Sequence, residues 1–157
     1  MIIGEKALTD TTETRLLLPA LRPLYASVEP LVWPLMRIAV GWNFVVHGWG
    51  KVMAGPAALV PGFAQVGFPD ATMLILFLTF IEFVGGICIM LGLFTRFFAA
   101  ACAIELAYIC FGLYWPNGFS WLKRGYEYVL LWGLLCFAIA LKGGGRLSLD
   151  RLIGREL

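Results

Sequence analysis

Four long apolar stretches, separated by polar or turn-forming residues, dominate the hydrophobic pattern of this chain. They cover about residues 31–52, 71–93, 97–115 and 125–141. Each is close to the roughly 20 apolar residues that a helix needs to cross the hydrocarbon core of a bilayer. Because lipid offers no hydrogen-bond partner to the backbone, such segments must be helical. The pattern therefore predicts an all-α integral membrane protein with a bundle of four transmembrane helices.

The segments between these stretches differ in length. Residues 53–70 are punctuated by glycine and proline, which predicts a loop, whereas only Phe94-Thr95-Arg96 lie between the second and third stretches. The short connection predicts a tight antiparallel hairpin. We divide the chain into a mobile or interfacial segment at 1–30, a four-helix domain at 31–141 and a polar tail at 142–157.

Composition supports the membrane assignment and excludes several other classes. Charged residues make up 14% of the chain, against about 25% in soluble domains, and the mean hydropathy is +0.85. The net charge of +2, with no basic run among aromatics, does not point to nucleic acid. Nucleotide-binding glycine motifs and metal-ligand spacings are absent, and one histidine cannot supply a bis-histidine haem site. We therefore expect no metal, haem or nucleotide cofactor.

The distribution of lysine and arginine predicts the orientation. With both termini on one side of the membrane, that side carries more basic residues than the other, as cytoplasmic loops do. The predicted cytoplasmic set is Lys6, Arg15, Arg22, Arg96, Lys142, Arg146, Arg151 and Arg155, and the opposite set is Lys51, Lys123 and Arg124. We expect a multi-pass protein of the bacterial inner membrane with both termini in the cytoplasm.

Ionisable side chains lie within or at the edges of the predicted spans: Arg37, His47, Glu82, Glu105 and Glu127. A charge at the bilayer centre costs about 2.5–3.5 kcal/mol on insertion scales. Such groups are therefore either paired to fix helix packing or retained for a function. Glu127 also fits an interfacial ion pair with Lys123 or Arg124.

One face of the first span collects polar and small residues at helical spacing: Arg37, Gly41, Phe44, His47, Gly48 and Lys51. At about 100° per residue this face covers roughly a third of the helix, and we expect it to look into the bundle. The arrangement allows an Arg37–Glu82 pair. Nearer the outside it allows His47 to pair with a carboxylate, and the sequence does not specify which glutamate provides it. Lys51 is expected to extend toward the surface.

These residues suggest a site for a quinone held between helices. Quinone reduction requires protons, and His47 beside Glu82 or Glu105 would deliver them or hold a quinone oxygen. These three residues are our catalytic candidates. Arg37 would keep a carboxylate charged or neutralise an anionic ligand. The alternative is that the same groups only pair with one another and fix the packing.

Several short motifs follow one another in a fixed order over about residues 33–151. They are Arg37-x-x-x-Gly41-x-x-Phe44-x-x-His47-Gly48-x-x-Lys51, Gly62-Phe63 to Gly67-Phe68-Pro69, Glu82-x-x-Gly85-Gly86, Leu91-Gly92-Leu93-x-Thr95-Arg96, Glu127-Tyr128 and Gly145-Arg146-Leu147-Ser148-Leu149-Asp150. Together these motifs resemble the DoxX family of small four-helix membrane proteins. The family takes its name from a subunit associated with thiosulfate:quinone oxidoreductase. Other members look like membrane partners of sulfur-handling and oxidative-stress enzymes.

The resemblance implies a membrane subunit that docks a soluble or peripheral oxidoreductase and offers a polar pocket to quinone. It would take part in catalysis only within such a complex. At the family's polar motif positions stand Arg37, His47, Lys51, Glu82, Arg96 and Glu127. From these, the candidates for cofactor binding are Arg37, Lys51, Arg96 and Glu127.

Two alternatives belong to other functional classes. One is a scaffold without enzymatic activity, in which the polar residues serve assembly alone. The other is transport of a small solute or proton, for which a homo-oligomer would build the pathway between subunits.

Overall fold

The computed structural model describes residues 16–156, and every regular element in this part of the chain is a helix. The all-α prediction is therefore confirmed. Two compact units, Met1–Pro30 and Leu31–Leu157, are distinguished. In the first unit, a 3-10 turn at Pro19–Leu21 precedes the start of helix α1, Arg22–Ala54, which continues into the second unit. The part of the predicted mobile or interfacial segment at 1–15 lies outside the described residues.

Helix α1 begins well before the predicted start near Leu31. Pro23 is the second residue of the helix, where the missing N–H of proline costs little because that group has no partner within the first turn. After α1, the predicted loop at 53–70 contains helix α2, Pro56–Gln65. Gly55 has a φ of 73°, which redirects the chain between the two helices.

The predicted tight hairpin is present between helix α3, Thr72–Leu91, and helix α4, Thr95–Tyr108. Gly92, with a φ of 71°, ends α3 in the left-handed region. Helix α4 continues without a break through a π-helical turn at Ile109–Tyr114 and a 3-10 turn at Trp115–Asn117. The last long helix is α5, Glu127–Lys142, which follows a short 3-10 turn at Trp121–Lys123.

Two of the four predicted spans meet the length and hydropathy expected of a membrane-crossing helix within the described residues. These are the stretches Thr72–Leu91 and Thr95–Asn117. Helix α5 has 16 residues, and polar residues of α1 such as Arg37 and His47 lower the hydropathy of that helix. Both are helical, as predicted, but length and composition alone do not identify them as spans.

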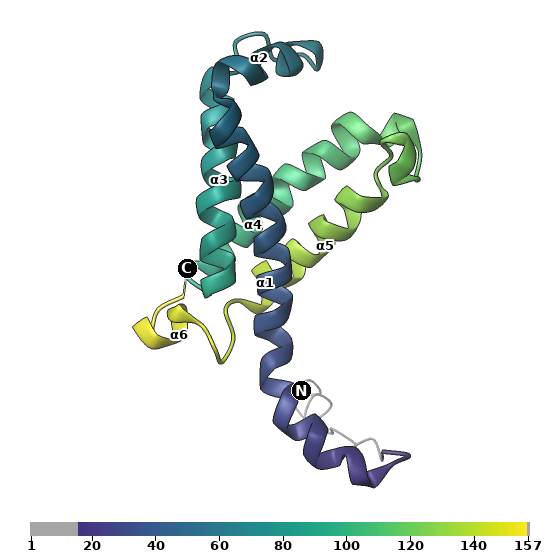
Figure 1. Cartoon of the computed structure of the whole chain (residues 1–157), viewed down its shortest axis with the longest axis vertical. Coiled ribbons are helices and arrows are strands. Elements are labelled where there is room, and N and C mark those ends of the chain that lie inside the picture. Colours follow the sequence, from purple (N-terminus) through teal and green to yellow (C-terminus); the bar gives the residue numbers. More distant parts are fainter. Residues whose placement is uncertain (1–15, 157) are drawn as a thin grey trace, which may run out of the picture. The chain divides into compact units, whose positions relative to one another are not determined.

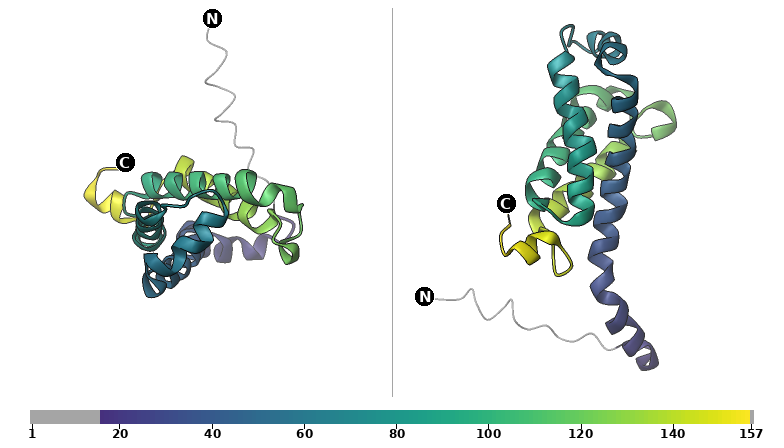
Figure 2. Two further views of the ribbon diagram at one scale, coloured as in Figure 1. Left: turned by 90° about the horizontal axis from the view of Figure 1, so that it is seen from above. Right: turned by 60° about the vertical axis from the view of Figure 1, so that its left-hand side comes forward.

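In the second unit, α3 lies beside α1, while α4 and α5 form a hairpin that crosses this pair at an angle (Figure 1 and Figure 2). Glycines bring α1 and α3 close together. A Cβ atom on Gly41 would lie 2.5 Å from the Gly86 carbonyl oxygen, and one on Gly48 would lie 2.5 Å from the Phe83 nitrogen. Such close backbone approach through small residues is typical of membrane helix packing.

The core of the second unit is built from aliphatic, aromatic and cysteine side chains of α1, α3, α4 and α5. Its buried members are Val40, Phe44, Ile81, Cys88, Ile89, Phe98, Ala99, Cys102, Cys136 and Ile139. All four cysteines are buried free thiols. They act as small apolar residues in the packing.

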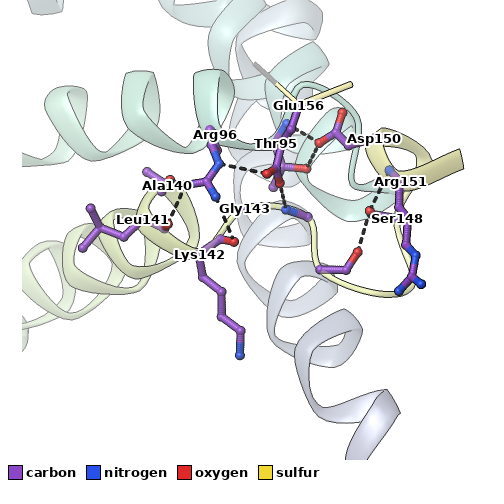
Figure 3. A network of polar contacts seen from close by, with 12 residues as sticks. Thr95, Arg96, Ala140, Leu141, Lys142, Gly143, Ser148, Asp150, Arg151 and Glu156 are labelled. Atoms are coloured by element: carbon purple, nitrogen blue, oxygen red, sulfur yellow. Dashed lines mark hydrogen bonds and ion pairs between the residues drawn. The ribbon is translucent and has the colours of Figure 1, made fainter. Parts of the chain in front are cut away.

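The C-terminal segment folds back onto the α3–α4 hairpin. After Gly143 the chain turns toward the short helix α6, Leu149–Ile153. Figure 3 shows the resulting network, in which the Asp150 carboxylate accepts hydrogen bonds from the backbone N–H and the hydroxyl of Thr95, at 3.0 and 2.6 Å. It also accepts one from the Phe94 N–H at 2.6 Å. The predicted polar tail thus provides the cap for the start of α4.

Candidate functional site

Three ionisable side chains from three helices meet in the second unit. The Lys51 Nζ of α1 lies 2.5 Å from the Glu82 Oε1 of α3 and 3.9 Å from the Glu105 Oε1 of α4. The close approach at Gly48 explains the geometry, because Gly48 contacts Phe83, the neighbour of Glu82, and Lys51 follows Gly48 by nearly one helical turn. We call Lys51, Glu82 and Glu105 the Lys51 centre.

Lys51 differs from its expected place. The side chain is 22% exposed and turns inward to the two carboxylates instead of extending to the surface. The reason is electrostatic, because the two buried carboxylates attract the Lys51 ammonium group. Glu82 and Glu105 are both buried, as predicted for inward-facing groups.

The carboxylates of this centre are incompletely satisfied. Among residues 16–156, neither oxygen of Glu105 has a hydrogen-bond partner, and the same holds for the Glu82 Oε2. Two carboxylates also face one ammonium group, so the centre has excess negative charge unless it holds a proton. Buried polar atoms are nearly always paired, and unpaired ones suggest a missing partner such as a ligand or water.

A cavity of about 560 Å³ opens beside this centre. Lys51 and Glu105 are its charged lining residues, and helices α2, α3 and α4 supply mainly apolar side chains. The lining consists of Lys51, Leu59, Gly62, Phe63, Val66, Phe68, Leu74, Leu78, Ile104, Glu105, Tyr108, Ile109, Leu113 and Tyr114. A mostly apolar cavity with a few convergent polar groups is the usual form of a small-molecule site.

Arg37 does not pair with Glu82, which corrects the proposed arrangement. Its guanidinium Nη2 donates a hydrogen bond to the Leu147 carbonyl oxygen, and Asp150 is near enough to interact with it electrostatically. Glu82 is instead bound to Lys51. The folded-back C-terminal segment supplies the partners of Arg37, and helix positions alone could not indicate them.

His47 lies apart from the Lys51 centre. It is exposed and lines a groove of about 830 Å³ with Phe119, Trp121, Glu127 and Tyr128. No hydrogen bond or ion pair joins His47 to Glu82 or Glu105 among the described residues. The structure therefore separates His47 from the other two catalytic candidates.

Glu127 begins α5 and takes part in local structure. Its Oε2 accepts a hydrogen bond from the Trp121 N–H at 3.3 Å, and its own N–H donates to the Phe119 carbonyl oxygen at 2.9 Å. Within residues 16–156 it forms no ion pair with Lys123 or Arg124. Nearby, the Tyr128 hydroxyl donates to the Asn43 Oδ1 at 2.7 Å and links α5 to α1.

Arg96, the remaining binding candidate, connects two chain segments. Its guanidinium donates to the carbonyl oxygens of Ala140, Leu141 and Lys142 at the end of α5, and pairs with Glu156 at 3.0 Å (Figure 3). A cation at a helix C-terminus satisfies carbonyl groups that have no partner within the helix. This geometry is structural, and Arg96 is outside the lining of the cavity beside the Lys51 centre.

Sequence reasoning missed Asp150 as a structural residue, although it stands in the last of the quoted motifs. The available signal was the arrangement Ser148-x-Asp150 after a glycine run, which is typical of a helix start. In the structure the Ser148 hydroxyl accepts a hydrogen bond from the Arg151 N–H at 3.2 Å. The contact of Asp150 with α4 is long-range and had no local signal.

Comparison with known proteins gives two matches. The DoxX family model matches residues 32–115. An uncharacterized protein of Haemophilus influenzae is 35% identical over 125 residues, which are 78% of this chain and 90% of that protein. No solved structure matches the chain significantly.

Proposed function

The chain belongs to the DoxX family of membrane proteins, and from this premise we propose that it is a membrane subunit of a quinone-linked oxidoreductase. In this proposal the Lys51 centre binds the head group of a lipophilic quinone and exchanges protons with it. The observation that carries the proposal is the cavity of about 560 Å³, whose mainly apolar lining includes Lys51 and Glu105 as its charged residues.

The lining of the cavity fits an amphipathic ligand. Its aliphatic and aromatic side chains offer a favourable environment for an isoprenoid tail, because apolar surface is removed from contact with water. The polar groups are few and lie together, so that they would orient one end of the ligand. The volume is within the range of about 300–1,000 Å³ that small-molecule sites occupy.

The unpaired oxygens of Glu105 provide the hydrogen-bonding capacity. In its protonated form this carboxyl group donates from one oxygen and accepts at the other, and the Lys51 ammonium donates as well. A quinone carbonyl accepts such hydrogen bonds, and a quinol hydroxyl donates. The centre therefore suits both the oxidised and the reduced head group.

A bound quinone would accept two electrons and two protons and would leave as the quinol. Glu105 would pass the proton of its carboxyl group to the ligand and then take up another proton from solvent, once for each of the two protons that the reduction requires. The Lys51 ammonium would stabilise the negative charge of the Glu105 carboxylate between these steps. The partner oxidoreductase would supply the electrons.

The direct test uses equilibrium dialysis to measure the binding of a short-tailed benzoquinone or naphthoquinone to the purified full chain in detergent. Loss of a hydrogen bond to a charged group costs about 1.5–3 kcal/mol. We therefore expect Glu105→Gln and Lys51→Met to raise the dissociation constant by about tenfold or more. Thermal unfolding of each variant verifies that it remains folded.

Glu127→Gln makes the same chemical change in the groove that His47 lines, and serves as the matched comparison. We expect the dissociation constant to change less than about threefold in Glu127→Gln and in His47→Ala. A parent protein that binds neither quinone refutes the proposal. Loss of binding in His47→Ala, with Glu105→Gln unchanged, would place the ligand in the other groove and refute the assigned site.

A scaffold function is the second candidate, favoured by the polar contacts at the opposite end of the helices. Arg37 and Arg96 both bind main-chain carbonyl oxygens, as structural cations do. If this function is the correct one, Glu105→Gln lowers thermal stability or recovery of the partner and leaves the turnover of a surviving complex unchanged.

A further inference from the structure

We propose that the C-terminal segment forms a binding site for the head group of an anionic phospholipid. The site is a surface hollow of about 440 Å³ where the end of α5 meets α6. We call it the C-terminal hollow; its lining residues are Lys142, Gly145, Arg146, Ser148, Asp150, Arg151, Gly154, Arg155 and Glu156. It is separate from the Lys51 centre and does not depend on the function proposed for that centre.

The acidic groups of the hollow already have partners within the chain. Asp150 accepts the hydrogen bonds from Phe94 and Thr95 that cap α4. Glu156 pairs with Arg96 and also accepts a hydrogen bond from the Gly144 N–H at 2.7 Å. Among the described residues, Asp150 is directed to the start of α4 and Glu156 is paired with Arg96, so neither carboxylate forms an ion pair with Arg146, Arg151 or Arg155.

The cations of the hollow are largely unneutralised. Within residues 16–156, the guanidinium groups of Arg146, Arg151 and Arg155 form no hydrogen bond or ion pair, and all three residues are exposed. The Lys142 Nζ lies 4.3 Å from the centroid of the Trp33 ring, without an anionic partner. Figure 3 shows the Lys142 and Arg151 side chains extending away from the hydrogen-bonded network. The three guanidinium groups beside one hollow, with the Lys142 ammonium held over the Trp33 ring, offer donors for a phosphate.

Apolar side chains beside these cations identify a lipid as the source of the phosphate. Leu147 and Ile153 are exposed, and Leu152 has an exposed fraction of 82%. Exposed basic and large aliphatic residues stand next to one another in this short segment, a combination found in segments that bind at a membrane surface. A free anion would gain nothing from the aliphatic groups, whereas acyl chains would cover them. Clusters of basic residues next to a membrane helix attract anionic lipids.

The test uses the purified full chain in detergent and a fluorescent phosphatidylglycerol, with an equally labelled phosphatidylcholine as the neutral comparison. We expect the anionic lipid to bind at least tenfold more tightly than the neutral one. Each basic residue near a membrane surface contributes about 1 kcal/mol to such binding, so combined replacement of Arg146, Arg151 and Arg155 by glutamine should weaken it by about a hundredfold. Raising the salt concentration should weaken binding to the parent protein as well.

Lys123→Gln with Arg124→Gln is the matched control, because these exposed basic residues lie outside the hollow. The control should bind as the parent does, and the corresponding arginine-to-lysine triple variant should retain most of the binding. Unfolding temperatures measured without lipid show whether the variants are folded; if the glutamine triple variant is not, Arg155→Gln alone should weaken binding by about fivefold.

Two results would overturn the proposal. Equal affinity for the anionic and neutral lipids would show that the cations do not select a phosphate-bearing head group. Displacement of the labelled lipid by inorganic phosphate as effectively as by unlabelled phosphatidylglycerol would show a site for free anions. Replacement of Leu152 and Ile153 by serine should weaken lipid binding and leave phosphate binding unchanged, and the absence of this difference also argues for a free anion.

Discussion

The close packing of α1 on α3 can be tested at Gly48. A Cβ atom at this position would lie 2.5 Å from the Phe83 nitrogen and 2.7 Å from its Cα atom. Because both atoms belong to the backbone of α3, they cannot move aside as a side chain could. Gly48→Ala therefore requires the two helices to separate locally.

Gly50 provides the comparison within the same helix, since a Cβ atom there would have nothing within 4 Å. Both variants gain about 0.5–1 kcal/mol from replacing a helical glycine by alanine. Gly48→Ala also loses about 1–3 kcal/mol to overpacking. The shared gain cancels, so the difference in unfolding free energy between the two variants should be about 1–3 kcal/mol, with Gly50→Ala the more stable.

Unfolding of the purified protein in mixed detergent micelles, followed by circular dichroism at increasing dodecyl sulfate, measures this difference. Gly48→Ala should also weaken quinone binding, because separation of α1 from α3 moves the Lys51 ammonium away from the Glu82 carboxylate. Gly50→Ala should bind quinone as the parent does. The two readouts together connect the helix contact to the Lys51 centre.

Equal stability of Gly48→Ala and Gly50→Ala would refute the close contact between α1 and α3. In that case, Lys51 would also lose the structural reason for its position beside Glu82. A destabilised Gly48→Ala with unchanged quinone binding would retain the contact but contradict its connection to the ligand site.

Two further predictions concern the C-terminal end of the second unit, both measured by the same unfolding assay. Gly92→Ala should lower the unfolding free energy by about 2–4 kcal/mol, because it places a Cβ in the left-handed region and against the Arg37 guanidinium. Gly154 has a similar φ of 72° but open surroundings, so Gly154→Ala should lower it by only about 1 kcal/mol. Equal losses would contradict the placement of Arg37 against Gly92. Asp150→Asn should lose about 1–3 kcal/mol by weakening the cap of α4, and Thr95→Val, which removes one of these hydrogen bonds, should lose less; an unchanged Asp150→Asn would argue against the cap.

The positions of the helices followed largely from local signals. Apolar runs and glycine or proline at their ends predicted α3, α4 and α5, because these features act within a few residues along the chain. The start of α1 and the presence of α2 were missed. Residues 1–30 were assigned to a mobile or interfacial segment and residues 53–70 to a loop, whereas Pro23 and Pro56 each stand in the first turn of a helix, where proline is well tolerated.

The pairing of the charged residues could be predicted only in part. The cost of a charge in contact with lipid indicated that Glu82 and Glu105 face inward, and both are buried. The partners depend on how far each helix is shifted along its neighbour, which the periodicity does not specify. The contact of Gly48 with Phe83 sets that shift and places Glu82 beside Lys51. The C-terminal segment supplies the hydrogen-bond partner of Arg37.

The distribution of counter-charges separates the structural residues from the candidate for ligand binding. Arg37 donates one hydrogen bond to the Leu147 carbonyl and lies near Asp150, although its Nε and Nη1 have no partner among the described residues, and the partly exposed Lys51 is paired with Glu82. Each of these two cations thus has an acceptor within the chain. Glu105 is the remaining charge, 3.9 Å from an ammonium that is already paired, and it borders the cavity. An unpaired carboxylate in an apolar site is stable only if it takes up a proton or a partner. Both outcomes favour a ligand that exchanges hydrogen bonds or protons, and for this reason Glu105, more than His47, is the residue on which the proposed function depends.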